Sequence, residues 1–377
     1  MKLLFHVQHF LGVGHHRRAE ALARALVQAG HDVTVASGGQ PVPGEDWGGA
    51  EVVHLPPARV NAADFRTLRH PDGTPVDDSW REARRTQLLA LLAQVAPDVI
   101  LLEGFPFARR QLKFELVPLL DAAKALPTPP LVATSLRDIL VFNKPPKRHD
   151  EVLGLVETYI DLVLIHGDPR LVPLERSFTS GGRIPEAKKA YTGFVAPNPP
   201  AARTRVASVV VSVGGGAVGA ATLWTALRSR PFTHFADASW LLVGGAMMEE
   251  AVLADLRAAA PAGVIVERFR ADFRAVLAGA DLSISMAGYN TALDILQTGV
   301  RSVLIPFAEG DETEQTLRAA LFAEAGRAVA VDPEGLTPEI LGAAVDRAAA
   351  LTPVTLDLAM DGAPTSAAIL AARVAAR

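Results

Sequence analysis

Two histidines follow a pair of glycines near the start of the chain, in the segment GVGHHRR at residues 12–18. A glycine-rich turn lets backbone amides approach a ligand closely, and a histidine beside it can take a proton from a hydroxyl near neutral pH. We therefore predict that His15 is a general base and that Gly14 brings backbone amides to a phosphate. The alternative is a histidine that merely begins a helix. His9 and His16 are weaker candidates for the base.

The same segment departs from a dinucleotide-binding fingerprint. Arg17 stands where the third glycine of the G-x-G-x-x-G pattern would fall. The next apolar segment, at residues 31–37, is followed by glycines rather than by the acidic residue that would bind a ribose in that motif. Both departures argue against a nicotinamide or flavin, and we predict no cofactor.

Glu103 is the second candidate catalytic group, because it closes an apolar segment at residues 97–104 that has the pattern of a buried strand. In that position it can orient His15 or a substrate hydroxyl. It is followed by aromatic and basic side chains, namely Phe105, Phe107, Arg109, Arg110 and Lys113. These would suit an anionic or lipid-linked acceptor, but an amphipathic helix with a solvated basic face would give the same pattern.

Two more glycine turns lie in the second half of the chain. SVGGGAVGAA, at residues 212–221, contains Gly214, Gly215 and Gly216, and SMAGYNTALDIL, at residues 285–296, contains Gly288. A glycine turn at a helix N-terminus favours a bound anion such as a diphosphate. Asp294 follows within the second of these helices and can accept hydrogen bonds from the vicinal hydroxyls of a ribose. Taken alone, Asp294 would be a solvated helix carboxylate.

Only a scaffold that gathers the ends of several strands can bring these residues together. Apolar strand patterns alternate with helical ones, which predicts parallel sheets covered by helices. The predicted strands are at residues 2–10, 31–37, 97–104, 129–135 and 160–167, and then at 208–214, 239–245, 263–269, 281–286, 301–307 and 327–331. Helices are predicted at 17–30 and 79–96 among others. The proline-rich segment at residues 195–205 separates the two series.

We therefore predict an α/β protein with two Rossmann-like domains, at residues 1–197 and 205–377. The last helix, at residues 363–377, is free to pack back on the N-terminal domain. Ligands of such sheets bind beyond the carboxyl ends of the strands, and in a tandem pair those ends can face each other across a cleft.

The segment at residues 266–331 resembles the nucleotide-sugar half of the GT-B glycosyltransferases, in particular the MurG-like family of type 28 that includes the N-acetylglucosaminyltransferase of lipid II synthesis. That family has a glycine turn, a helix with an acidic ribose-binding residue, a PF pair and two glutamines. Asp294 stands where the family usually has glutamate, and Glu314 and Gln315 stand near the glutamine pair. The opening GVGHHRR is similar to the N-terminal glycine loop of the family.

The opening and HGDPRLVPLE, at residues 166–175, also resemble a bacterial group of predicted glycosyltransferases. The resemblance implies that the N-terminal domain binds the acceptor and that the C-terminal domain binds a UDP-sugar, with UDP-GlcNAc one candidate. It also implies transfer with inversion and without a metal ion. The residues assigned to the donor are Gly14, Gly214, Gly215, Gly216, Phe269, Arg270, Ala287, Gly288, Asn290, Thr291, Asp294, Glu314 and Gln315.

Composition excludes several other classes of protein. The net charge of −4 gives no general attraction to nucleic acid, and the absence of cysteine excludes disulfides, a thiol nucleophile and cysteine-ligated metals. The chain contains no D-x-D triplet, so the usual metal–diphosphate clamp is missing. The uncharged run at 206–227 fits a buried strand, glycine loop and helix better than a membrane span.

We therefore predict a cytoplasmic glycosyltransferase without a metal ion or transmembrane segment, with peripheral contact at the inner face of the membrane left open. Two alternatives use the same fold. One is a nucleotide-sugar epimerase or hydrolase, in which elimination or water replaces the acceptor. The other is a sugar-nucleotide sensor without turnover.

Overall fold

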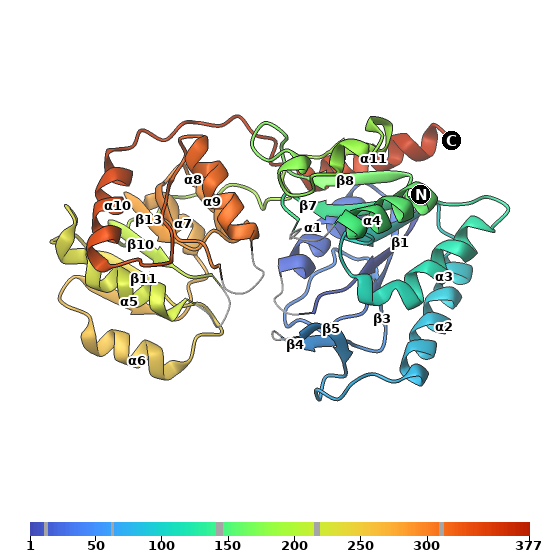
Figure 1. Cartoon of the computed structure of the whole chain (residues 1–377), viewed down its shortest axis with the longest axis horizontal. Helices are drawn as coiled ribbons and strands as arrows, with labels where there is room; N and C mark the ends of the chain where they lie inside the picture. The colour runs from blue at the N-terminus through green and yellow to red at the C-terminus, as the bar shows by residue number, and fades with distance from the viewer. Residues whose placement is uncertain (11–13, 62–63, 141–145, 215–218, 309–312) are drawn as a thin grey trace. The chain divides into compact units, whose positions relative to one another are not determined.

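The computed structural model describes residues 1–10, 14–61, 64–140, 146–214, 219–308 and 313–377. The chain divides into two compact units. The first contains Met1–Leu140, Lys144–Ala196 and Leu358–Arg377, and the second contains Pro197–Asp357. Figure 1 shows the two units with their elements labelled.

The described part of the first unit is built on a seven-stranded sheet whose order is β3-β2-β1-β6-β7-β8-β9, with every pair parallel. The strands are β1 (Lys2–Val7), β2 (Asp32–Ser37), β3 (Glu51–His54), β6 (Val99–Glu103), β7 (Leu131–Arg137), β8 (Leu162–His166) and β9 (Lys189–Tyr191). The helices are α1 (Gly14–Gln28), α2 (Asp78–Val95), α3 (Lys113–Lys124), α4 (Pro146–Tyr159) and α11 (Gly362–Ala375). A separate antiparallel hairpin joins β4 (Arg59–Asn61) and β5 (Asp64–Arg69).

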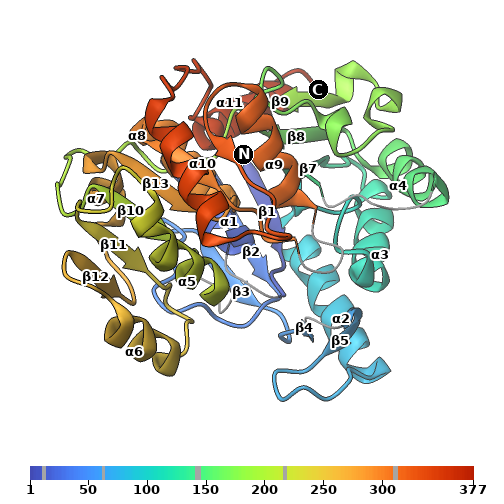
Figure 2. The ribbon, with the colours of Figure 1, turned by 60° about the vertical axis from the view of Figure 1, so that its left-hand side comes forward.

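The described part of the second unit has a six-stranded parallel sheet with the order β12-β11-β10-β13-β14-β15. Its strands are β10 (Val209–Ser212), β11 (Trp240–Val243), β12 (Val264–Glu267), β13 (Leu282–Ser285), β14 (Arg301–Leu304) and β15 (Val329–Ala330). Its helices are α5 (Ala220–Ser229), α6 (Glu250–Ala259), α7 (Phe273–Gly279), α8 (Tyr289–Thr298), α9 (Glu314–Glu324) and α10 (Pro338–Ala350). Figure 2 shows α5 and α10 packed side by side over this sheet.

Both sheets have the doubly wound order, in which the chain starts at the centre, moves to one edge and then returns to build the other half. The central strands β10, β11 and β13 are buried along their whole length, as their short apolar sequences require. The order reverses between β1 and β6 in the first unit and between β10 and β13 in the second. Ligands of such sheets bind at these reversal points, beyond the carboxyl ends of the strands.

The last helix, α11, belongs to the first unit. Ala367 and Leu370 are buried in the core of that unit, and α11 packs against α1. Gly362 N donates to Phe194 O at 2.9 Å, which holds the returning chain against the end of the first series of elements. The C-terminal segment is therefore a structural part of the N-terminal unit.

The helix predicted at 17–30 begins earlier than the sequence indicated. It starts at Gly14, so His15 lies in its first turn and not in a loop before it. His15 and Arg18 both contact Glu103 at the end of β6, so the added first turn is held against the sheet. The short strands β3 and β9 and the hairpin were not predicted, because they are too short and polar to show an apolar alternation.

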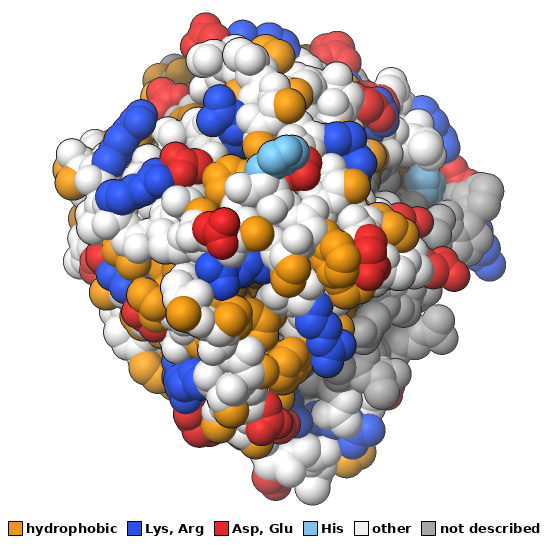
Figure 3. Space-filling model, turned by 90° about the vertical axis from the view of Figure 1, so that its left-hand side faces the viewer, with side chains coloured by type: hydrophobic (Ala, Val, Ile, Leu, Met, Phe, Trp, Pro, Cys, Tyr) orange, Lys and Arg blue, Asp and Glu red, His pale blue; other side chains and the backbone are white. Residues whose placement is uncertain are grey.

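Figure 3 shows one face of the protein in a space-filling view. Acidic, basic and hydrophobic side chains are interspersed over the described part of this face. Mixed charges of this kind produce no extended field of one sign that would attract a polyanion. Among the residues that the structure describes, no helix is both long and apolar enough to cross a membrane.

Candidate active site

The first unit brings His15 and Glu103 together at the reversal point between β1 and β6. His15 Nδ1 lies 2.5 Å from Glu103 Oε1, although 88 residues separate them in the sequence. Glu103 is the last residue of β6, and His15 is the second residue of α1. The side chain of Glu103 is 1% exposed and that of His15 is 28% exposed, so the imidazole connects a buried carboxylate to the surface.

Two arginines hold the carboxylate of Glu103. Arg18 Nη2 donates to Oε1 at 2.8 Å, and Arg109 Nε donates to Oε2 at 3.1 Å. Burial alone would raise the pKa of Glu103, but Arg109, His15 and Arg18 hold that pKa well below its ordinary value. Glu103 is therefore ionised at neutral pH and is an acceptor of hydrogen bonds rather than a proton donor.

His15 is neutral in the same environment. Burial lowers the pKa of His15 to about 3, and the nearby Arg109 and Arg137 act in the same direction while Glu103 opposes them. A neutral imidazole beside an ionised carboxylate carries its proton on the nitrogen that faces the carboxylate. Nδ1 therefore donates to Glu103, and the lone pair on Nε2 remains as a base.

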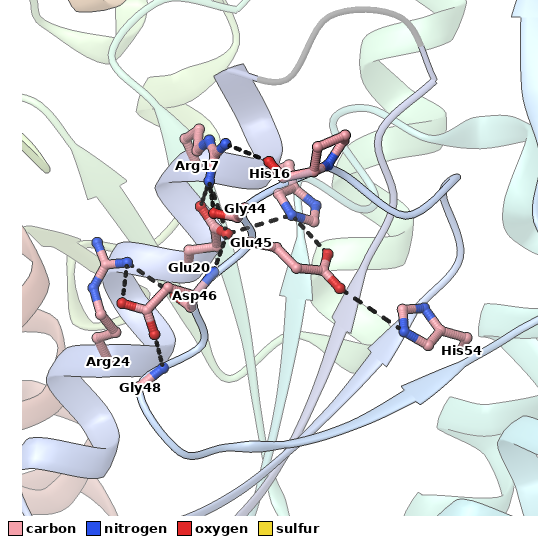
Figure 4. Close-up of polar contacts among 10 residues, drawn as sticks. His16, Arg17, Glu20, Arg24, Gly44, Glu45, Asp46, Gly48 and His54 are labelled. Carbon is pink, nitrogen blue, oxygen red and sulfur yellow. Dashed lines mark hydrogen bonds and ion pairs between the residues drawn. The ribbon is translucent and has the colours of Figure 1, made fainter. Parts of the chain in front are cut away.

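His16, the neighbour of His15, serves another part of the unit. Its Nε2 lies 3.3 Å from Glu45 Oε2 and 3.6 Å from Glu20 Oε1, and its side chain is fully buried. Figure 4 shows this cluster, in which Arg17 and Glu20 fasten the loop after β2 to α1. Asp46 N donates to Glu20 at 2.7 Å in this loop. His16 is thus part of a loop attachment, whereas His15 is directed at Glu103.

The glycines assigned to phosphate binding lie at the carboxyl ends of the central strands. Gly14 begins α1, Gly214 follows β10 with a φ of +75°, and Gly288 caps the N-terminus of α8 after β13. A Cβ atom built on any of these three would meet nothing within 4 Å among the described residues. No described residue therefore fills the space beside these turns. Gly215 and Gly216 lie outside the described residues.

Asp294 lies on α8 with its carboxylate paired to an arginine that was not predicted. Arg274 Nε donates to Asp294 Oδ1 at 2.7 Å, and the side chain of Asp294 is 14% exposed. Burial raises the pKa of Asp294, while Arg274 acts against that rise. The structure thus places Asp294 nearly two helical turns beyond the Gly288 cap and gives it a fixed partner.

The other residues assigned to the donor lie around the same edge of the second sheet. Ala287 is buried, and its carbonyl accepts a hydrogen bond from Arg318 at 2.8 Å. Arg318 also donates to Glu314 at 2.7 Å, which joins the end of β13 to the start of α9. Gln315 Oε1 accepts from the backbone of Phe307 at 3.2 Å.

Asn290 is exposed and Thr291 is half-buried in the first turn of α8. Phe269 is 66% exposed beyond the end of β12, where an aromatic ring is available for stacking on a base. Arg270, beside it, pairs with Glu267 at 3.1 Å and Asp272 at 2.9 Å. Residues 309–312, which precede α9, lie outside the described part of the chain.

Comparison with known proteins finds a family profile that matches most of the second unit. The profile of the glycosyltransferase family 28 C-terminal domain matches residues 210–358. Residues 210–358 are thus similar to the C-terminal domain of glycosyltransferase family 28. The resemblance to this family that the glycine turns and Asp294 indicated is confirmed. The matched residues include the glycine turns at Gly214 and Gly288.

Curated relatives match over part of their length. The chain is 35% identical over 151 residues to the UDP-N-acetylglucosamine–N-acetylmuramyl-(pentapeptide) pyrophosphoryl-undecaprenol N-acetylglucosamine transferase of Burkholderia orbicola. That match covers 38% of this chain and 41% of the relative. The enzyme of the same description from Burkholderia lata is 37% identical over 100 residues, which are 26% of this chain and 27% of the relative.

Solved structures extend the likeness in fold to the whole chain. MurG of Acinetobacter baumannii has a TM-score of 0.64 at 16% identity and covers 99% of this chain and 100% of its own. The calicheamicin glycosyltransferase CalG4 has a TM-score of 0.64 at 17% identity and covers 100% of this chain and 97% of its own. The chain therefore has the GT-B fold, as predicted.

Sequence reasoning overlooked the arginines that complete both sites. Arg18 follows His15 by three residues on α1, a spacing that places both on one helix face, and this signal was available. Arg274 carries no such signal, because it lies 20 residues before its partner Asp294 on another helix. Among the described residues, no group of three or more His, Asp or Glu side chains could hold a metal ion.

Proposed function

We propose that this protein is a glycosyltransferase that moves a sugar from a UDP-sugar to the hydroxyl of an acceptor, with inversion and without a metal ion. The observation that carries the proposal is the His15–Glu103 pair at the reversal point of the first sheet, in a chain with a family 28 domain. A buried carboxylate that orients a neutral histidine is the arrangement of a general base.

In the proposed reaction, His15 Nε2 accepts the proton of the acceptor hydroxyl while Nδ1 keeps its hydrogen bond to Glu103. The hydroxyl oxygen forms a bond to the anomeric carbon as the bond from that carbon to the diphosphate breaks. A single displacement of this kind inverts the configuration, and UDP leaves with the bonding electron pair. The imidazolium that forms is stabilised by the Glu103 carboxylate.

The second unit would hold the donor. The relatives are named for UDP-N-acetylglucosamine, and the structure of VinC, at 17% identity and a TM-score of 0.59, contains DTDP. A nucleoside diphosphate therefore suits the glycine turns at Gly214 and Gly288, where backbone amides and the α8 dipole can neutralise its charge. UDP-GlcNAc is the first donor to examine.

The acceptor would be anionic and lipid-linked, as in the pyrophosphoryl-undecaprenol that appears in the names of the relatives. Beyond the end of β6, Arg110, Lys113 and Arg148 all lie around the one carboxylate of Glu151. Three cations around one anion leave a net positive charge that suits a phosphate-bearing acceptor. Such an acceptor would bring the protein to the cytoplasmic face of the membrane.

Removal of divalent metal should leave nucleotide binding intact. We expect UDP to bind with the same dissociation constant, within about twofold, in the presence and absence of a chelator, because backbone amides and a helix dipole can neutralise the diphosphate. Isothermal titration calorimetry with and without EDTA measures this directly. Loss of binding in EDTA would contradict the metal-independent mechanism.

Replacement of Asp294 by alanine should weaken the binding of nucleotide by about 1 to 3 kcal/mol, the cost of losing a hydrogen bond to a charged group. The loss should be equal for UDP and for UDP-GlcNAc, because the proposed contact is to the ribose and not to the sugar. Calorimetry on both ligands tests this. Unchanged affinities would remove Asp294 from the donor site.

A further inference from the structure

One side chain in the second unit connects the predicted ribose-binding residue to the start of that unit. Arg274, on α7, directs its three guanidinium nitrogens at three different partners. Its Nε donates to Asp294 Oδ1 at 2.7 Å, its Nη1 donates to the carbonyl of Asn198 at 2.7 Å, and its Nη2 donates to Gln297 Oε1. A guanidinium that is bound at every nitrogen holds a fixed plane.

Gln297 extends this network to the residue before Asn198. Its Nε2 donates to the carbonyl of Pro197 at 2.7 Å. Pro197 is the first residue of the second unit after the first unit ends at Ala196. Arg274 and Gln297 therefore attach Pro197 and Asn198, where the second unit begins, to α8, the helix that carries Asp294.

The pairing leaves one oxygen of Asp294 for a ligand. Oδ1 accepts from Arg274, whereas Oδ2 accepts no hydrogen bond from any residue that the structure describes. The Asp294 side chain retains 14% exposure, and the Gly288 turn at the start of the same helix has open space beside it. A hydroxyl that reaches the exposed part of this carboxylate would meet Oδ2 in an orientation that Arg274 sets.

We propose that Arg274 is a positioning residue for ribose recognition, which fixes Asp294 so that Oδ2 faces the 2′-hydroxyl of a ribonucleotide and ties this contact to the Pro197–Asn198 backbone. The inference rests on the proposed binding of a UDP-sugar in the second unit. It adds a specificity: the site prefers a ribonucleotide to the matching 2′-deoxyribonucleotide, and Arg274 is needed for that preference. An arginine that only held the Pro197–Asn198 backbone in place would change the affinities for both nucleotides by the same factor.

The test compares the affinities of UDP and 2′-deoxy-UDP in the full chain by calorimetry. The parent should bind UDP about 10- to 100-fold more tightly, the ratio that one hydrogen bond to a charged acceptor gives. Asp294→Ala should lower this ratio to near one. Arg274→Ala should lower it by about fivefold or more, and the double variant should show no further reduction, because the two residues act through one contact.

Arg205→Ala is the matched control. Arg205 also pairs with a carboxylate, that of Asp281, and also donates to the backbone of the second unit, at Gly279 O. It lies away from α8 in sequence and contact, so its loss should leave the UDP to 2′-deoxy-UDP ratio at the parental value. Arg274→Lys keeps the charge but not the three-way contact, and an intermediate ratio is expected.

The outcomes separate this inference from the proposed function. If the parent binds neither UDP nor 2′-deoxy-UDP, the proposed binding of a UDP-sugar fails. If the parent binds UDP but Asp294→Ala keeps the parental ratio, the ribose contact of Asp294 is absent and only this inference fails. If Asp294→Ala loses the ratio while Arg274→Ala and Arg274→Lys keep it, only the role of Arg274 is overturned. If Arg274→Ala shows no cooperative melting transition and is therefore unfolded, Arg274→Lys provides the test. A lowered UDP to 2′-deoxy-UDP affinity ratio in Arg274→Lys supports the proposal, and a parental ratio refutes it.

Discussion

Replacement of His15 by alanine should lower the turnover number by about 100- to 10,000-fold, the usual contribution of a general base. The dissociation constant for UDP should change by less than about twofold, because His15 Nε2 acts on the acceptor hydroxyl. Steady-state kinetics with an authentic acceptor, together with calorimetry on UDP, measure the two effects. His15→Gln keeps much of the size and polarity of the side chain but cannot take the proton, so it should be almost as slow as the alanine variant.

The pH dependence offers a second measurement on the same residue. A general base is active when unprotonated, so activity is lost as the pH falls through its pKa. The pKa of His15 is lowered to about 3. The turnover number should therefore stay level from pH 7 to pH 5, where a base with an ordinary pKa of about 6.5 would lose roughly tenfold or more. A decline centred near pH 6.5 would show that the base keeps an ordinary histidine pKa and would contradict the lowered pKa of His15.

Replacement of Glu103 by glutamine should damage both stability and turnover. The carboxylate is 1% exposed and pairs with Arg18 and Arg109. Loss of one member of a buried ion pair costs about 3 to 5 kcal/mol, because the remaining charges stay buried without compensation. Turnover should fall by about 100-fold or more as well, because His15 loses the acceptor that fixes its tautomer.

Glu115→Gln is the control for stability alone. Glu115 is fully buried and accepts from Arg84 at 2.6 Å and 2.7 Å, but it lies in the interior with His6 and not beside His15. Urea denaturation should show a loss similar to that of Glu103→Gln, while the folded fraction keeps parental turnover. If both variants kept parental turnover, Glu103 would have no catalytic role. If neither His15→Gln nor Glu103→Gln slowed transfer, the catalytic assignment of His15 and Glu103 would fail; the sensor interpretation would gain only if no acceptor supported any transfer.

The stability contributed by Glu115 also has a defined pH window. Burial would raise its pKa, but Arg84 and His6 lower it to about 2 from an ordinary value of 4.5. A carboxyl group with a depressed pKa stabilises the folded state above its unfolded pKa and loses that contribution as the pH falls. Urea midpoints of the parent should therefore decrease between pH 4.5 and pH 2, and those of Glu115→Gln should decrease less.

The alternation of apolar strands and amphipathic helices could be predicted from the sequence because both patterns are local. The short apolar runs that became β10, β11 and β13 are buried along their length, and no other element fits such runs between glycine turns. For the same reason, the sequence predicted that His15 follows the first strand and that Glu103 closes β6. Glycine placement likewise marked the turns at Gly214 and Gly288.

The sequence alone thus determined which residues lie at strand ends, and therefore which could take part in chemistry. Only the tertiary structure decided which strand ends are neighbours. Because β1 pairs with β6, His15 meets Glu103 across 88 residues, and Arg109 reaches the same carboxylate. The tertiary structure also decided two other contacts between separate elements: Arg274 pairs with Asp294, and α11 returns to the first unit. Such contacts depend on the order of strands and the packing of helices, which no local pattern of residues encodes.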